Sequence, residues 1–154
     1  MQTRLVRLWV LVGAGILVLS MPISAQTLDD AFNFSASGLL VHRVRLTTIA
    51  ENVANILTFK DEATGLPYQK QIVVLEPTET GVRVSSIQKS TEPFGRYYDP
   101  AVPQSDSEGY FYYPNVNLPT EMVDLSYTEA MFEANVTTFK VTKAMYQQVI
   151  DVLK

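Results

Sequence analysis

The sequence predicts an α+β fold in which long N- and C-terminal helices pair as a coiled-coil-like bundle, with a small β-rich module between them. Three observations predict it. Residues 120–153 contain neither proline nor glycine and repeat apolar side chains every seven positions. Residues 28–57 carry a second heptad pattern, whereas proline and glycine interrupt residues 58–119. A sustained seven-residue apolar repeat is typical of helices that pack on other helices.

The chain begins with the pattern of a cleavable export signal. Arg4 and Arg7 precede an apolar run, Leu8–Leu19, that is short for a membrane span. Pro22 ends this run, and we expect cleavage after the small residue Ala25. An uncleaved membrane anchor is the alternative interpretation.

The first predicted helix places its apolar residues at alternating steps of three and four, which is heptad spacing. These residues are Leu39, Leu46, Ile49, Val53 and Ile56, with the single histidine, His42, on the same face. We interpret His42 as a core or interface residue. Gly38 interrupts the helix at a cost of about 1 kcal/mol relative to alanine, so it predicts either a kink or the close approach of a neighbouring helix.

The middle of the chain has the pattern of short strands. Two strand-like runs, Tyr68–Leu75 and Val82–Ile87, are separated by the turn residues Pro77 and Gly81, which predicts a β-hairpin. The prolines that follow are too closely spaced for elements longer than about five residues. We therefore expect a small β-rich module with an extended, proline-braced loop.

The second predicted helix carries two apolar seams on different faces. The first seam is Leu125, Phe132, Phe139, Tyr146 and Leu153. The second seam is Val123, Tyr127, Ala130, Ala134, Thr137, Val141, Ala144 and Gln148. Because the chain offers only one other long helix, the second seam is expected to meet other subunits. The predicted parts are a signal peptide (1–25), an N-terminal axial helix (26–58), the middle module (59–119) and a C-terminal axial helix (120–154).

Composition argues against catalysis, metal binding and nucleic-acid binding. The formal net charge is −4, which provides no basic surface for nucleic acid. With no cysteine and one histidine a zinc site is not expected, and no Gly-x-Ser-x-Gly motif marks a nucleophile. Asp99, Asp106 and Glu108 could hold calcium, but their spacing matches no EF-hand loop and favours a solvated turn. We expect no cofactor and no small-molecule substrate.

An aromatic cluster lies in the proline-rich region, at Tyr97–Tyr98 and Tyr110–Tyr113. One interpretation is a glycan-stacking platform in a periplasmic binding module. The other, which we favour, is that these rings form the core of a small module with their hydroxyls at its edge.

Several strings resemble the bacterial flagellar rod and hook protein family. Toward the N-terminus these strings are Ser35–Leu39, Arg43–Leu46, Ala50–Asn55 and Pro67–Tyr68. The residues similar to the proximal-rod branch are Tyr98, Asp99, Pro100, Gly109, Tyr110, Pro114, Asn115, Val116, Asn117, Glu121, Met122, Val123 and Asp124, then Glu133–Thr137 and Lys143–Met145. The family usually has Asn-Asn where Glu51 and Asn52 stand, and its members are normally exported without a cleaved signal.

The resemblance implies a structural subunit of the flagellar basal-body proximal rod and not an enzyme. Its terminal helices would polymerise into the torque-transmitting shaft that crosses the periplasm. Asn52 and Asn55 of the N-terminal motif join the apolar seams as expected subunit-packing residues. The implied partners are copies of the chain, other rod proteins, and the rod-base and ring components of the basal body. The alternative is a periplasmic glycan-binding or scaffold module of the same fold.

The predicted export signal can be tested at its cleavage site. We predict that mature subunits begin at Gln26, because a retained apolar segment would add an unpartnered patch to a helix that packs in a narrow assembly. Ala25→Trp should block cleavage, hold the protein at the inner membrane and prevent assembly. Mass spectrometry of isolated basal bodies checks the mature terminus, and peptides containing Trp9 or Met21 would contradict the prediction.

Overall fold

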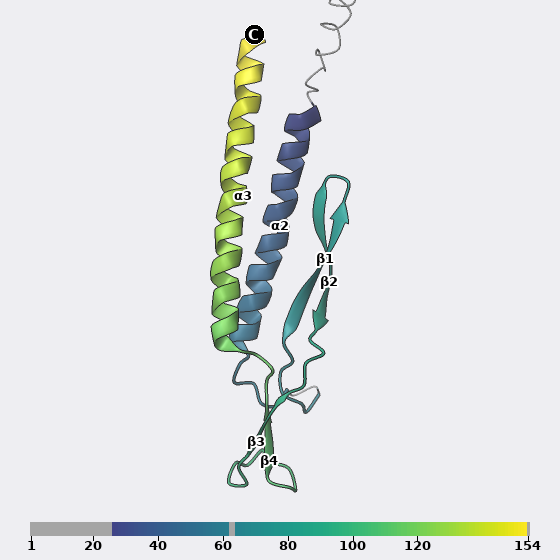
Figure 1. Cartoon of the computed structure of the whole chain (residues 1–154), viewed down its shortest axis with the longest axis vertical. Coiled ribbons are helices and arrows are strands. Elements are labelled where there is room, and N and C mark those ends of the chain that lie inside the picture. Colours follow the sequence, from purple (N-terminus) through teal and green to yellow (C-terminus); the bar gives the residue numbers. More distant parts are fainter. Residues whose placement is uncertain (1–25, 62–63, 154) are drawn as a thin grey trace, which may run out of the picture.

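The computed structural model describes residues 26–61 and 64–153, except for the side chains of residues 26 and 27. The predicted signal peptide lies outside the described residues. Helix α2 spans Gln26–Ala54 and helix α3 spans Leu118–Val152. The two helices lie side by side and run in opposite directions, so that α3 ends near the start of α2 (Figure 1). The predicted α+β class with two long packed helices is confirmed.

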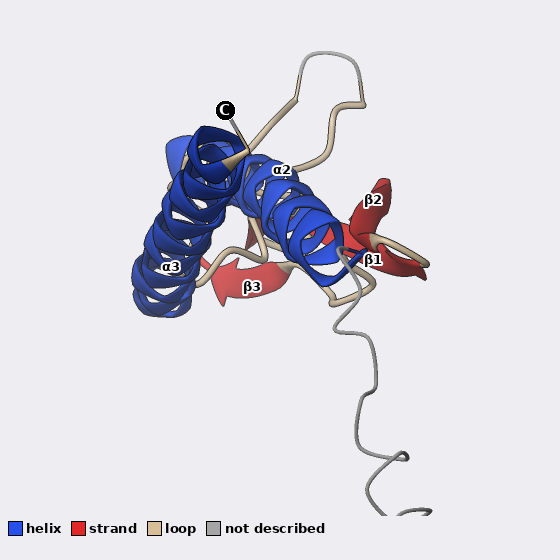
Figure 2. Cartoon of the chain, turned by 90° about the horizontal axis from the view of Figure 1, so that it is seen from above, coloured by secondary structure: helices blue, strands red, loops and turns tan. Residues whose placement is uncertain are grey.

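The predicted β-rich middle is confirmed, and it consists of two two-stranded antiparallel sheets. Strands β1 (Gln71–Thr78) and β2 (Gly81–Lys89) form a hairpin, and β3 (Gly95–Tyr98) pairs with β4 (Tyr110–Tyr113) in a shorter ribbon. The hairpin lies along α2 on the side away from α3, and the ribbon extends beyond the end of the helix pair (Figures 1 and 2). Within the described part of the chain, α3 contacts no element other than α2.

The predicted hairpin is confirmed, although β1 begins and ends later than expected and β2 extends beyond its expected range at both ends. Pro77 lies inside β1, opposite Val82, and the turn is made by Glu79 and Thr80. Gly81 follows with φ +139°, and a Cβ at this position would collide with Ser37 on α2. The glycine is therefore required both by the backbone conformation and by the close contact between hairpin and helix.

Side chains define the ends of both helices. Helix α2 ends at Ala54, short of the predicted end, because Asn55 and Thr58 bond locally: Asn55 Nδ2 donates to the Glu51 carbonyl at 2.9 Å and Thr58 Oγ1 donates to Asn55 Oδ1 at 3.1 Å. Such local bonds compete with continued helix. Helix α3 is capped by Asn117, whose Oδ1 accepts from the backbone N–H of Thr120 at 3.1 Å.

The contact between α2 and α3 combines a close backbone approach with aromatic packing. An added Cβ at Gly38 would lie 3.0 Å from the side chain of Asn135, so this glycine marks a helix crossing and not a kink. Further along, the rings of Phe32 and Phe139 lie 4.4 Å apart, and Tyr146 meets Phe32 edge-on at 6.4 Å. The core is nevertheless small: Val41, Ile49 and Val116 are the buried apolar residues among those described.

The aromatic contact can be tested by placing a charge in it. We predict that Phe139→Asp lowers the free energy of unfolding by about 2–4 kcal/mol, because it removes ring packing and exposes Phe32 to a carboxylate. Glu129→Ala, an exposed position on the same helix, should change it by less than about 0.5 kcal/mol. Urea unfolding followed by circular dichroism measures both. Equal stabilities of the two variants would contradict the packing described here.

Candidate assembly surface and the polar junction beside it

A buried asparagine joins three segments of the chain at one end of the helix pair. Asn52 is only 1% exposed, and its side-chain amide makes four hydrogen bonds. Its Nδ2 donates to the Gln71 carbonyl at 3.0 Å and to Glu121 Oε2 at 3.1 Å. Its Oδ1 accepts from the Gln71 N–H at 2.9 Å and from the Tyr68 hydroxyl at 3.0 Å. This set uses the full bonding capacity of the amide and links α2 to β1 and α3.

The partner of Asn52 on α3 is a buried carboxylate. Glu121 is 1% exposed, and its Oε1 lies 2.6 Å from Lys70 Nζ, its one polar partner among the described residues. A buried carboxylate without compensation is costly, and this ion pair and the bond from Asn52 together offset that cost. Burial raises the pKa of Tyr68 above its ordinary value, which keeps the phenol protonated and able to donate.

The segment before α3 is bonded to the same place. Asn115 Oδ1 accepts from the Lys70 N–H at 2.7 Å, and Asn115 Nδ2 donates to the Glu92 carbonyl at 2.9 Å. Pro114 and Val116 on either side are buried. We call this group the polar junction; its members are Asn52, Tyr68, Lys70, Gln71, Asn115 and Glu121. The junction thus brings together residues that lie far apart in the sequence: Asn52 and Glu121 are more than 60 residues apart.

Other residues of the family strings lie outside the junction. Met122 and Val123 are exposed on α3, and Asp124 is half-buried. Tyr98, Asp99 and Pro100 lie at the end of β3 and in the loop that follows it. Sequence reasoning missed Lys70 and Gln71, since neither residue belongs to a periodic pattern.

The first predicted seam of α3 is the face that packs on α2. Leu125, Phe132, Phe139 and Tyr146 are half-buried, and they alternate with Thr128 and Thr142, which are buried. These threonines donate to the carbonyls of Asp124 at 2.7 Å and Thr138 at 3.0 Å, one turn back in the same helix. Their polar groups are therefore satisfied within α3. Leu153, the last predicted member of the seam, follows the end of α3 and is exposed.

The predicted packing residues of α2 are less uniform. Ile49 and Asn52 are buried, whereas Leu39, Leu46, Val53, Asn55 and Ile56 are half-buried. His42 is also half-buried, and its Nδ1 has no partner among the described residues. Burial, followed by the nearby charge of Arg45, lowers the pKa of His42, so the ring is neutral at neutral pH.

The second predicted seam of α3 remains uncovered in the single chain. Val123 is 68% exposed, Tyr127 is 55% exposed and Val141 is 54% exposed. The smaller members are exposed as well: Ala130, Ala134, Thr137, Ala144 and Gln148. A continuous apolar surface of this kind on a soluble helix marks an interaction site. We call it the exposed seam, and it is the candidate assembly surface.

The aromatic residues of the ribbon do not form the core that we expected. Tyr97, Tyr98, Tyr112 and Tyr113 are exposed, because a two-stranded ribbon has no second layer to cover its faces. Phe111 is the ring that packs inward, 4.9 Å from Phe59. The remaining ring contacts lie within the ribbon itself: Tyr98 meets Tyr110 at 5.3 Å, and the guanidinium of Arg96 lies 3.5 Å from the Tyr110 ring centre.

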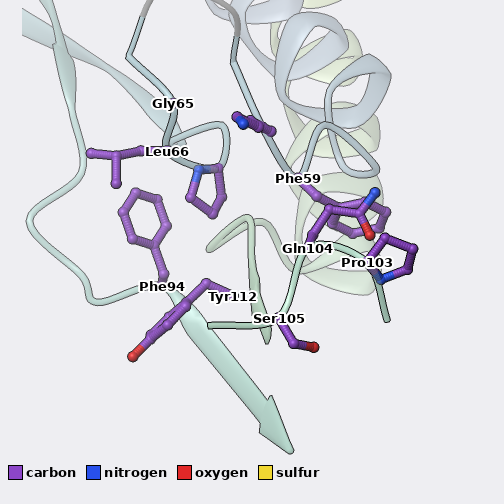
Figure 3. Close-up of a pocket in the computed structure, with 10 residues that line it drawn as sticks. Phe59, Gly65, Leu66, Phe94, Pro103, Gln104, Ser105 and Tyr112 are labelled. Carbon is purple, nitrogen blue, oxygen red and sulfur yellow. The ribbon is translucent and has the colours of Figure 1, made fainter. Parts of the chain in front are cut away.

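An open hollow of about 500 Å³ lies beside the ribbon (Figure 3). Phe59, Leu66, Phe94 and Tyr112 supply its apolar surface, and Lys60 is its charged lining residue. The acidic residues nearby hold the loop rather than forming a cluster. Asp106 Oδ1 accepts from the N–H groups of Glu108 and Tyr110, both at 2.9 Å, which is the behaviour of a turn residue. No group of three or more metal-ligating side chains occurs in the described ranges.

Named relatives match most of this chain. The flagellar basal-body rod protein FlgC of Borreliella burgdorferi is 33% identical over 150 residues, covering 82% of this chain and 98% of the relative. FlgC of Aquifex aeolicus is 33% identical over 132 residues, covering 81% and 96%, and FlgC of Bacillus subtilis is 32% identical over 150 residues, covering 84% and 100%. The chain belongs to the FlgC family of flagellar basal-body rod proteins.

A family model of flagellar rod proteins matches the C-terminal part of the chain. Residues 107–152 match the C-terminal region of the flagellar basal-body rod proteins FlgEFG. This match contains β4, the Asn115 and Glu121 part of the polar junction, and the whole exposed seam. In the described ranges, no helix has the length and apolar character needed to cross a bilayer.

The ion pair of the polar junction can be tested with two substitutions at one position. We predict that Glu121→Ala lowers the free energy of unfolding by about 3 kcal/mol, since it leaves Lys70 and Asn52 without their partner. Glu121→Gln keeps an acceptor for Asn52 and should cost less. Urea titration of both variants decides the point, and a smaller loss for alanine than for glutamine would contradict the assignment.

Proposed function

We propose that this chain is a structural subunit of the flagellar proximal rod, which polymerises through its terminal helices into a torque-transmitting shaft. The observation that carries the proposal is the exposed seam of α3. One face of this helix packs on α2, and a second, largely apolar face has no partner among the described residues. A helix with two apolar seams is suited to a multi-helix wall.

The small core of the single chain supports the same proposal. Few apolar side chains are buried, whereas large ones such as Leu40, Val123 and Tyr127 face solvent. A subunit of this kind gains most of its hydrophobic stabilisation only when neighbours cover these surfaces. The long helix pair would then lie along the axis of the assembly.

The proposed partners are copies of the chain, other rod proteins, and the rod-base and ring components of the basal body. The names of the relatives support a basal-body location. The predicted export signal supports placement in the periplasm. We propose no catalytic role. The comparisons lend no support to the alternative of a glycan-binding module.

The proposal can be tested on the exposed seam. We predict that Val141→Asp abolishes incorporation into basal bodies and motility, because it puts a charge into an apolar contact between subunits. The free energy of unfolding of the single chain should stay within about 0.5 kcal/mol, since Val141 is exposed there. Thr80→Asp, in the turn of the β1–β2 hairpin, adds the same charge away from the seam. A strain that carries this substitution should swim normally. Normal motility of the Val141 variant would refute the proposal.

A further inference from the structure

A second uncovered surface runs along α2, on the side that faces neither α3 nor the hairpin. Its members lie at alternating steps of three and four and are all exposed: Leu40, Arg43, Thr47, Ala50 and Ala54. We call this surface the outer stripe. Apart from Leu40 and Arg43 its side chains are small, which lets another helix approach closely. The chain therefore presents two helical faces, the outer stripe and the exposed seam, at matching heptad spacing.

The charges on these two faces are complementary when two copies stand side by side at the same height. Within one chain Asn52 contacts Glu121, Gly38 lies against Asn135, and Asp29 meets Tyr146, which sets the levels of α2 and α3. These contacts place Arg43 of α2 at the same height along the helix axes as Glu129 and Glu133 of α3. An arginine on the outer stripe of one copy is therefore level with two carboxylates on α3 of the other copy.

Within the described part of the chain, Arg43, Glu129 and Glu133 take part in no ion pair. Glu129 and Glu133 are both exposed and lie one turn apart on α3, an arrangement in which like charges destabilise a helix. An arginine brought against this pair from another copy would remove the repulsion.

A shape match accompanies the charge match. A hollow of about 280 Å³ lies beside the outer stripe, with Leu40, Val44, Thr47 and Ile87 among its lining residues. The largest side chain of the exposed seam, Tyr127, is 55% exposed and level with this hollow by the same register. A tyrosine ring entering an apolar recess is a typical anchor of an interface.

We infer that the outer stripe of α2 receives the exposed seam of α3 from a second copy, side by side and without axial offset. Tyr127 of one copy enters the hollow of the next, and Arg43 meets Glu129 and Glu133. Each copy uses the stripe on one side and the seam on the other, so the contact is heterologous, and because it has no axial offset it repeats into a closed ring. This inference rests on the proposed function and names the contact through which the rod subunit polymerises.

A charge exchange tests the pairing of Arg43. Arg43→Glu alone, and Glu133→Arg alone, should each lower the amount of the chain in isolated basal bodies on the order of tenfold, because like charges are brought together. The two substitutions combined should restore incorporation and swimming. A double variant no better than either single one would overturn the inference, as would single variants that incorporate normally.

Disulfide trapping tests the register independently, and the absence of native cysteine makes it clean. Leu40→Cys with Ala134→Cys in one chain should give, on oxidation of isolated basal bodies, a ladder of dimers, trimers and larger species. Leu40→Cys with Val123→Cys displaces one sulfur by about 16 Å along α3 and should not cross-link, because a disulfide needs Cα atoms within about 7 Å. Chains present in basal bodies without the ladder would overturn the contact but leave the proposed function intact. Unsubstituted chains absent from basal bodies would overturn both.

Discussion

The side chain of Asn52 is the constraint on which the rest of the subunit depends. It lies between α2, β1 and α3, and each of its bonds goes to a different group on the neighbouring segments. The Asn52 amide has no hydrogen-bonding capacity left, so a shift of any one segment would leave a buried polar group without a hydrogen bond. The Glu121–Lys70 ion pair raises this cost further, because it places a charge in the same buried volume. The polar junction therefore fixes where the helix pair begins.

The height and rotation of α3 follow from this junction. Glu121 anchors its first turn, and the contact of Phe139 with Phe32 holds its middle. With both points set, the packed seam must face α2 and the exposed seam must face away. The fold of the single subunit therefore leaves the candidate assembly surface exposed. The buried threonines between the apolar residues let the helices approach closely without leaving a polar group unpaired.

The two β-sheets have different relations to this frame. The β1–β2 hairpin is tied to α2 through Gly81 and Ser37, and it leaves the outer stripe of that helix free. The β3–β4 ribbon instead projects past the helix ends, where little else can cover its tyrosines. This explains why an aromatic cluster that suggested a core in the sequence is largely exposed in the structure. Exposure of a ring depends on what stands opposite it, which aromatic content alone does not specify.

The sequence by itself determined the two long helices, the β1–β2 hairpin and the presence of two seams on the second helix. These features follow from local periodicity and turn chemistry, which neighbouring residues settle among themselves. The sequence also identified Asn52, Asn115 and Glu121, because they belong to strings that resemble the rod and hook family. It did not predict that these residues meet in one junction. Only the tertiary structure decided which seam is covered, why α2 ends at Ala54 and which cation faces Glu121. Those outcomes depend on segments far apart in the chain, because a buried charge or amide takes its partners from whatever the fold brings beside it.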